Sequence, residues 1–427
     1  MELIPGYKYS DIGYVPEEWD VKRLYNFASV ATGSTPPTSN ATNYGDDFLF
    51  VSPVDMGEAK LITRTEKKLS PKGFSISRKF PRGSILFVCI GSTIGKCGIA
   101  STELTSNQQI NAIFPSPIFS EDYLYYAMAA ASPRVRALAG EQAVPLVNKT
   151  QFSETYVPLP PLPEQRAIAQ ALSDVDALLD TLDQVIAKKR DLKQAAMQQL
   201  LTGEKHLPGF SGDWELKSFG DLFDFSGGYS ASRDQLSNEG HCYLHYGDIH
   251  GSSKTCVNTS LDFLDIPKLS ISLGRISEGS LLKHGDVVFV DASEDDAGTS
   301  KHLVIENEDA IPFISGLHTI VAKSKANDLV HAYKHYCFQT LAIRQQFMFY
   351  AVGTKVSGIS KTNIAKLILP IPSIPEQTAI ADVLSSMDVE LANLEARRDK
   401  TRNIKQAMMQ ELLTGKTRLV EPQGANV

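Results

Sequence analysis

The sequence lacks the features that mark membrane, secreted and disulfide-rich proteins. Its longest apolar runs, such as Ser84–Ile90, have the length of a strand and fall far short of the ~20 residues that span a membrane. Residues 1–6 do not combine a basic start with an apolar core, so they do not resemble a signal peptide. The five cysteines are an odd, scattered set without the spacing of metal ligands. We therefore expect a cytoplasmic globular protein with reduced thiols.

Signatures of catalysis are missing as well. The chain contains no Asn/Asp-Pro-Pro-Tyr/Phe, the sequence required of an amino-methyltransferase. Gly91–Lys96 superficially resembles a Walker A loop. However, Ile90 stands where the first glycine is needed, and Cys97 replaces the Ser or Thr that would hold magnesium. We therefore expect neither methyl transfer nor nucleotide binding in this chain.

Two further groups of side chains suggest a nuclease or a metal site but lack the necessary spacing. Asp291, Glu294 and Lys301 could mimic a nuclease cluster, yet their spacing is wrong and only one half of the chain has them. His-Cys-Tyr-Leu-His at 241–245 has no fourth ligand at a recognisable distance, so a tyrosine-rich strand is favoured over a metal site. The sequence predicts no catalytic residue and no metal ligand.

The charge is distributed unevenly along the chain. The net charge of −7 argues mildly against a nucleic-acid partner. Yet Lys60–Lys96 holds nine Lys/Arg and one acid, and Tyr333–Lys366 holds five Lys/Arg and no acid. Local fields decide where a polyanion binds, so these matching stretches favour DNA, with ordinary solvated surface charge as the alternative.

An internal repeat organises the chain. Pro163–Gln165 returns as Pro375–Gln377, and Leu200–Gly203 returns as Leu412–Gly415, both 212 positions later. Each Pro-Glu suits the first turn of a helix and each Thr-Gly suits its end, which predicts two helices of about 39 residues and roughly 58 Å.

Apolar positions between these anchors recur at spacings of 4, 3, 4 and 3, the seam of a coiled coil. The seam residues are Ile168, Leu172, Val175, Leu179 and Leu182, matched by Ile380, Leu384, Met387, Leu391 and Leu394. The seam blurs after Leu182 and is expected to recover through Leu192 and Ile404. We expect the two helices to bury their seams on each other; the alternative is that each packs on its own globular half.

The globular segments repeat more loosely. Arg82–Val88 resembles His284–Val290, each a turn leading into a buried strand, and Ile110–Ile113 is aligned with Leu317–Ile320. A Pro-rich, extended hinge at 157–163, repeated at 369–375, precedes each long helix.

The fold class expected from this repeat is α+β. Two globular mixed α/β domains are separated and held by two long antiparallel helices, which form an intramolecular coiled coil with pseudo-two-fold symmetry. The expected boundaries are 1–158 and 207–370 for the globular domains, 159–206 and 371–418 for each hinge with its helix, and 419–427 for a tail.

The Pro-Leu-Pro-Glu-Gln start of a long helix, its Leu-Leu-Thr-Gly end and the Gly-Ser-Thr-Ile-Gly-Lys loop resemble those of Type I restriction–modification DNA-specificity subunits. The resemblance extends from Pro5 to about Lys416. It implies a non-catalytic chain whose globules are target recognition domains, each contacting one half-site of a bipartite duplex. The helices would set the spacing and carry two methyltransferase subunits, with restriction subunits added. S-adenosylmethionine, ATP and magnesium would be bound by those partners.

Two alternatives to this function remain. One is a specificity protein that works with a methyltransferase alone. The other is a coiled-coil scaffold with peptide-binding globules, against which the basic stretches and the duplicated order argue.

Polar loops supply the candidate DNA contacts. Ser92 and Lys96 suit phosphate contacts, with a plain hairpin as the alternative; Asn107–Gln109 could pair with adenine or simply form a turn. Ser293–Lys301 adds three acids that could accept from cytosine N4 or face solvent. In the first domain the candidates are Thr35, Thr38, Ser92, Thr93, Lys96, Asn107, Gln108, Gln109 and Lys149. In the second they are Tyr229, Arg233, Thr299, Lys301, His318, Lys355 and Lys361. The lysines among them could equally be surface charge.

Overall fold

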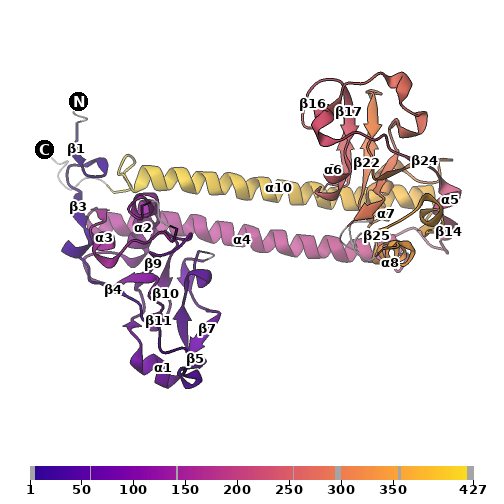
Figure 1. Ribbon diagram of the computed structural model, residues 1–427. Coiled ribbons are helices and arrows are strands. Elements are labelled where there is room, and N and C mark those ends of the chain that lie inside the picture. Colours follow the sequence, from indigo (N-terminus) through magenta and orange to yellow (C-terminus); the bar gives the residue numbers. More distant parts are fainter. Residues whose placement is uncertain are drawn as a thin grey trace. The chain divides into compact units, whose positions relative to one another are not determined.

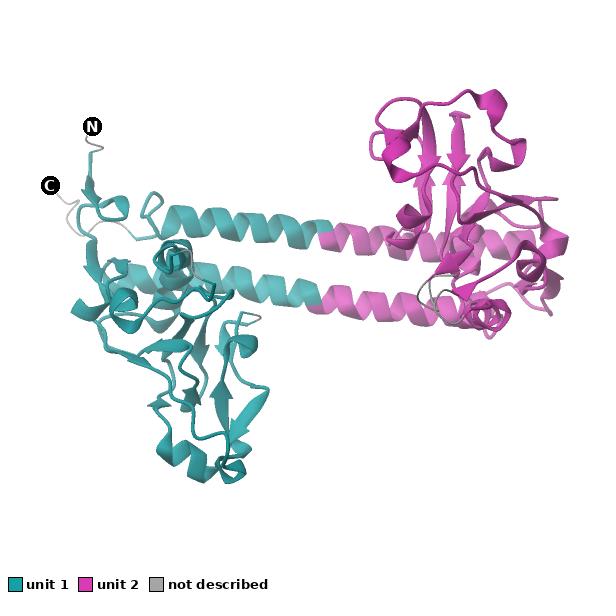
Figure 2. Cartoon of the chain, in the orientation of Figure 1, with its two compact units in different colours: residues 1–183, 396–427 teal, residues 184–395 magenta. Residues whose placement is uncertain are grey.

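A computed structural model describes residues 5–57, 59–140, 143–252, 254–293, 300–353 and 357–420 (Figure 1). The chain forms two compact units, residues 1–183 with 396–427 and residues 184–395 (Figure 2). Two long helices, α4 (Leu162–Leu201) and α10 (Ile374–Leu412), each give one half to each unit. The two expected long helices are therefore present.

The first unit contains a five-stranded sheet, with strand order β4-β12-β9-β10-β6, and a four-stranded sheet, with order β7-β5-β11-β8. The five-stranded sheet consists of β4 (Val30–Thr32), β12 (Ile110–Ile113), β9 (Ile85–Val88), β10 (Cys97–Ala100) and β6 (Leu61–Ile62). The four-stranded sheet consists of β7 (Lys67–Leu69), β5 (Tyr44–Val51), β11 (Leu104–Ser106) and β8 (Lys79–Phe80). The remaining elements are β1 (Tyr7–Ser10), β2 (Gly13–Pro16), β3 (Asp20–Arg23), β13 (Tyr156–Leu159), α1 (Pro71–Ile76), α2 (Glu121–Ala137) and α3 (Lys149–Ser153).

The second unit repeats the five-stranded topology, with order β15-β24-β20-β22-β18, and also contains a four-stranded sheet of order β16-β19-β17-β23. Its five-stranded sheet consists of β15 (Phe223–Gly227), β24 (Thr319–Ser324), β20 (Val287–Val290), β22 (His302–Glu306) and β18 (Cys256–Asn258). The other strands are β14 (Glu215–Ser218), β16 (Leu236–Ser237), β17 (His241–Leu244), β19 (Lys268–Leu269), β21 (Ala292–Ser293), β23 (Phe313–Ser315), β25 (Ser357–Gly358) and β26 (Ile368–Ile371). The helices are α5 (Phe219–Leu222), α6 (Tyr246–His250), α7 (His331–Cys337), α8 (Leu341–Tyr350) and α9 (Lys361–Ile364).

The central strand of each five-stranded sheet is buried on both faces, as the apolar run predicted. Ile85 and Phe87 of β9 lie in a core with residues of α2 and α4. Leu86 and Val88 lie in a second core with residues of the four-stranded sheet. The alternating residues of β20 divide between two cores in the same way, so each domain has one sheet face against helices and one against strands.

The strand register corrects one alignment made from the sequence. Ile110 pairs with Val88 of β9, whereas Thr319 pairs with Val290, the equivalent residue of β20. Thr319, and not Leu317, is therefore the counterpart of Ile110. The two-residue error arose because Leu317 continues the apolar pattern although it lies in the turn before β24.

In the Pro-Glu-Gln motif that starts each long helix, the glutamate and the glutamine are buried. Glu164 accepts a hydrogen bond from the indole Nε1 of Trp19 at 2.9 Å and pairs with Arg418 at 2.5 Å. In the second unit, Glu376 accepts from Trp214 Nε1 at 3.2 Å. His206, which occupies the repeat position of Arg418, lies 2.8 Å from Glu376.

The glutamine of the motif ties the helix start to its surroundings. Gln165 Nε2 donates to the carbonyl of Pro160, and its Oε1 accepts from the backbone of Ser120 at the start of α2. Gln377 makes the equivalent bonds with Pro372 and with Val330 at the start of α7. The motif therefore does more than begin a helix: it fixes that helix to its globular domain.

Ion pairs in each unit show that α4 and α10 run antiparallel. Lys405 pairs with Asp176 at 2.5 Å in the first unit, and the repeat-equivalent Lys193 pairs with Asp388 in the second. Tyr126 of α2 and Tyr336 of α7 each donate a hydroxyl hydrogen bond to the aspartate of their own unit, at 2.5 and 2.9 Å. A tyrosine–aspartate–lysine contact thus joins both helices to each globular domain.

The seam follows a different path from the expected one after Leu182. Leu192 and Ile404 are 47% and 46% exposed, whereas Ile186 and Thr401 are buried. The half-buried Lys193 and Lys405 take the places expected for Leu192 and Ile404, because their ammonium groups reach the aspartates of the other helix.

The expected seam residues before this point are all at least half-buried. The fully buried ones are Ile168, Leu172, Leu182, Ile380, Leu384 and Leu391. The half-buried ones are Val175, Leu179, Met387 and Leu394. Ile168 and Ile380 also belong to the globular cores, so the two packing alternatives are combined: the helices contact each other and their own domains.

The Pro-rich hinges are partly strands and not free joints. Val157–Leu159 lies in β13, which pairs with β3, and Leu369–Ile371 lies in β26, which pairs with β14. The boundary between the two compact units passes through both long helices, so the domain boundaries expected from the sequence stay a prediction. Most of the expected tail (421–427) lies outside the described residues.

All five cysteines are free thiols. Within the described ranges, the chain has no helix that combines the length and the apolar character needed to cross a membrane.

Replacing Tyr126 or Tyr336 by Phe removes only the hydroxyl that donates to Asp176 or Asp388. We expect each variant to lose about 1.5–3 kcal/mol of unfolding free energy, the usual contribution of a hydrogen bond to a charged group. Because the two contacts lie in different units, their effects should add. Urea unfolding measures this, with the exposed Tyr9→Phe as the control; equal stability of all variants would contradict the assigned contact.

Candidate nucleic-acid interface

Three segments that are far apart in sequence converge in the first unit. They are the loop after β4, the residues after β5 and the turn between β11 and β12. Together with β7 they line a groove of about 1120 Å³, in which Thr35, Thr38, Asn107 and Gln109 face the same space. The structure therefore brings together four candidates that the sequence analysis selected separately.

Hydrogen bonds within the groove fix the turn of Asn107–Gln109. The side chain of Asn107 donates to Gln109 Oε1 at 2.9 Å and accepts from the backbone of Gln109 at 3.0 Å. Thr35 donates to Gln108 Oε1 at 2.5 Å. The turn offered as an alternative is thus present, and it leaves the Gln108 side chain exposed. Exposed amides held by a fixed backbone are suited to paired hydrogen bonds with a base edge.

The Gly91–Lys96 loop lies beside this turn. A Cβ on Gly91 would come within 3.9 Å of Gln109 Nε2. Gly91 and Gly95 have φ of 96° and 104°, a left-handed backbone that favours glycine. Ser92 and Lys96 are exposed and Thr93 is half-buried, whereas Ile94 anchors the loop in the core.

Lys149 follows a segment attached to the same end of β9. The backbone of Val147 donates to the carbonyl of Cys89, and that of Gly91 donates to Pro145. Lys149 is exposed at the start of α3, which is capped by Asn148.

The second unit brings the equivalent three segments together. Tyr229 donates its backbone N–H to Ser315, which joins the loop after β15 to the turn before β24. The backbone of Asp291 donates to His318, as that of Cys89 does to Gln109, so His318 occupies the position of Gln109. His318 has a φ of 62°, unusual for a residue other than glycine.

Aromatic and charged groups surround His318. The rings of Tyr246 and His318 meet edge to face with centroids 5.6 Å apart, and the carboxylate of Asp291 lies 3.4 Å from His318 Nδ1. Arg233 extends from the neighbouring loop to Asp248 at 3.3 Å and is 65% exposed. Burial raises the pKa of the Asp291 carboxyl, although the nearby His318 opposes this shift.

Tyr246 was missed by the sequence analysis. It is the second residue after β17, as Pro53 is the second residue after β5 in the first unit, and the only available signal was an aromatic residue after a strand. Its neighbour His245 has a pKa lowered by burial and then by the charge of Arg233, so its Nδ1 accepts a hydrogen bond from Gly247.

Comparison with known proteins gives the family. A model of the Type I restriction modification DNA specificity domain matches residues 16–189 and again 211–401. The chain belongs to this family. Each of the two matched segments contains one globular domain. The expected fold class is confirmed, and so is the prediction that the chain is a specificity subunit and not a catalytic subunit.

Similar proteins include other Type I specificity subunits. The MjaIX specificity subunit of Methanocaldococcus jannaschii is 23% identical, covering 97% of each chain. The HindI specificity subunit of Haemophilus influenzae is 32% identical over 44% of this chain and 42% of its own. The crystal structure of the S subunit from M. genitalium superposes with a TM-score of 0.55 and 14% identity, covering 96% of this chain and 98% of that one.

Two basic residues of this specificity subunit that lie in the basic stretches do not line the groove. Lys60 pairs with Asp122 at 2.9 Å, and the buried Lys334 donates to the carbonyl of Gly285. Both are held inside their domains, so the count of basic residues overstated the surface available to phosphate. Lys67 and Lys68, by contrast, line the groove.

The structure describes two of the remaining candidates of the second domain, Lys301 and Lys361. The ammonium group of Lys361 approaches Gly227, whose added Cβ would lie 3.5 Å from it. Lys301 donates to the carbonyl of His250. Thr299 and Lys355 lie outside the described residues. DNA contacts at all of these positions stay a prediction.

Replacing both Lys67 and Lys68 by Ala should weaken DNA binding at all sequences about equally. The slope of log affinity against log salt should fall by up to about two, because each lost phosphate contact releases one fewer counterion. Lys60→Ala, from the same basic stretch but paired with Asp122, should leave the slope unchanged. Titrations of duplex DNA at several salt concentrations measure this. An identical slope in the double variant would remove these lysines from the interface.

Proposed function

We propose that this chain selects a bipartite, asymmetric duplex DNA target, with one half-site bound by each globular domain. The observation that supports this most is the convergence of the same three segments in both units, whose five-stranded sheets have one topology. The side chains there differ, with Asn107–Gln109 in one domain and Gly316–His318 in the other. One scaffold with two sets of polar loops suits a reader of two unlike base sequences.

We infer that the long helices fix the distance between half-sites and hold two methyltransferase subunits and the restriction subunits. S-adenosylmethionine, ATP and magnesium belong to those partners in this proposal. One similar structure, 16% identical with a TM-score of 0.58 and covering 94% of this chain and 99% of its own, is described as part of the assembly and conformational transition of a Type I R-M system.

Sequencing of methylated adenines in cells with and without the gene tests the proposal and identifies both half-sites. Absence of gene-dependent methylation, together with absence of site preference and salt dependence in DNA binding with the methyltransferase partner present, would contradict it. Co-purification of the chain with a methyltransferase but without restriction subunits would favour a specificity protein working with a methyltransferase alone.

Gln109→Ala should relax or change only one half-site, and His318→Ala only the other. The two residues occupy equivalent turns in different domains. We expect a discrimination loss of about 1–3 kcal/mol at one or two base pairs in each case, the usual contribution of a paired base contact. Sequencing of methylated sites with both variants measures this loss of discrimination. If one variant changed both half-sites, the assignment of one half-site to each domain would be contradicted.

Lengthening both helices by one heptad should lengthen the nonspecific spacer. Seven residues inserted after Asp183 and seven after Arg397 keep the observed pairing in register. Each insertion adds about 10.5 Å of helix, or up to about three base pairs at about 3.4 Å each. The half-sites, which serve as the internal control, should stay the same. A spacer of unchanged length would show that the helices do not set it.

A further inference from the structure

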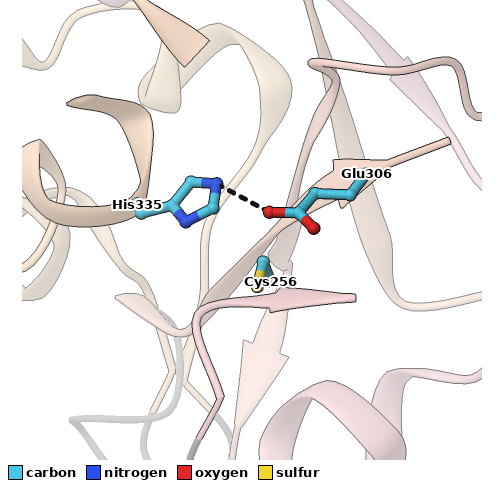
Figure 3. A group of neighbouring side chains, drawn as sticks. All are labelled: Cys256, Glu306 and His335. Carbon is cyan, nitrogen blue, oxygen red and sulfur yellow. Dashed lines mark ion pairs between the residues drawn. The ribbon is translucent and has the colours of Figure 1, made fainter. Parts of the chain in front are cut away.

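A group of three possible metal ligands lies in the second unit, outside the proposed DNA interface. Cys256 of β18, Glu306 of β22 and His335 of α7 are neighbours, and His335 and Glu306 face each other (Figure 3). Their three donor atoms lie within 4.8 Å of one another. His335 Nε2 is 3.5 Å from Glu306 Oε1, yet it is shielded from solvent and makes no hydrogen bond with any described residue.

The repeat shows that the architecture does not require this group. Strand pairing makes Leu61 the counterpart of Cys256, because each lies beside the equivalent residue of β10 or β22. The same strand alignment places Ser101 at the position of Glu306. The equivalent contacts of Tyr126 and Tyr336 place Tyr125 at the position of His335. The first domain builds the same sheet and helix without a thiol, a carboxylate or an imidazole at these places. The second domain therefore carries three donor side chains that the fold itself does not need.

We propose that Cys256, Glu306 and His335 bind Zn²⁺, with the fourth position left to water. Thiolate, imidazole and carboxylate are the donors found at zinc, whereas magnesium and calcium prefer oxygen alone. Zinc bonds of about 2.0–2.3 Å require the donors to close by roughly 1 Å. Side-chain rotations can supply this, since all three residues are only partly buried.

The protonation states suit a metal that enters by displacing a proton. Burial, with the nearby Glu306 carboxylate, raises the pKa of the Cys256 thiol to about 11, so the thiol is protonated without metal. Burial lowers the pKa of His335, and this favours the neutral imidazole, the form that coordinates a metal. Zinc would replace the thiol proton, which passes to solvent.

A metal here would join the edge strand β18 and its neighbour β22 to α7. The next residue of α7, Tyr336, donates to Asp388 of α10, so the site lies one residue from the contact between the domain and the long helix. Zinc should therefore stabilise the second unit, independently of whether the chain reads DNA.

Metal titration of the full chain, first stripped with a chelator, tests the proposal. We expect one Zn²⁺ or Co²⁺ per chain, a thiolate-to-cobalt charge-transfer band with Co²⁺, and a higher Tm with Zn²⁺ but not with Mg²⁺. Cys256→Ser should abolish the band and weaken Zn²⁺ binding more than about a hundredfold, because loss of a side chain that only supports a ligand costs about 10–100-fold.

His284→Gln is the matched control. His284 is exposed and its ring stacks on His331 of α7 at 4.2 Å, but it is not one of the three clustered donors. This variant should keep the band and the affinity. If Cys256→Ser fails to fold, Glu306→Gln and His335→Gln give the same test with the thiol intact, and circular dichroism verifies folding. Wild type that binds no Zn²⁺, or binds it no more tightly than the ligand variants, would overturn the proposal.

Discussion

Each unit depends on the contacts of one buried carboxylate at the start of its long helix. Glu164 is held by the indole of Trp19, which lies between β2 and β3, and by the guanidinium of Arg418, which follows α10. One side chain thus joins a globular domain, the start of one helix and the end of the other. A carboxylate in such a place is costly unless every acceptor is used, so its partners are as constrained as the glutamate itself.

In the second unit, the buried carboxylate has a different set of partners. Glu376 is paired with Trp214 and with His206, which replaces the arginine of the first unit. Because this framework and the tyrosine–aspartate–lysine contact are repeated, the loops at the ends of the sheets are free to differ. In one domain they present amides and lysines, and in the other an arginine, a tyrosine and a histidine. Two unlike DNA half-sites would need this separation between a constant framework and variable loops.

Sequence reasoning predicted what depends on local pattern. Heptad spacing and the Pro-Glu and Thr-Gly ends gave both long helices, and the apolar run before Val88 gave the central strand. It erred where distant charges decide burial: Leu192 is exposed and Lys193 is inward, because Asp388 lies across from it. It also misaligned Leu317, since strand register depends on pairing with β20 and not on hydrophobicity. Counting basic residues could not reveal that Lys60 and Lys334 are engaged inside their domains.

The sequence by itself determined that the chain is a duplicated α+β protein with two long helices, because repeated motifs and helix periodicity can be recognised directly from the order of residues. Only the tertiary structure decided which polar residues share a site. Thr35, Asn107 and Lys67 meet in one groove because three strands end or begin at the same place. Cys256, Glu306 and His335 meet because parallel strands and a crossing helix bring together residues far apart in the chain. Such convergence depends on long-range strand pairing, which no local pattern in this sequence encodes.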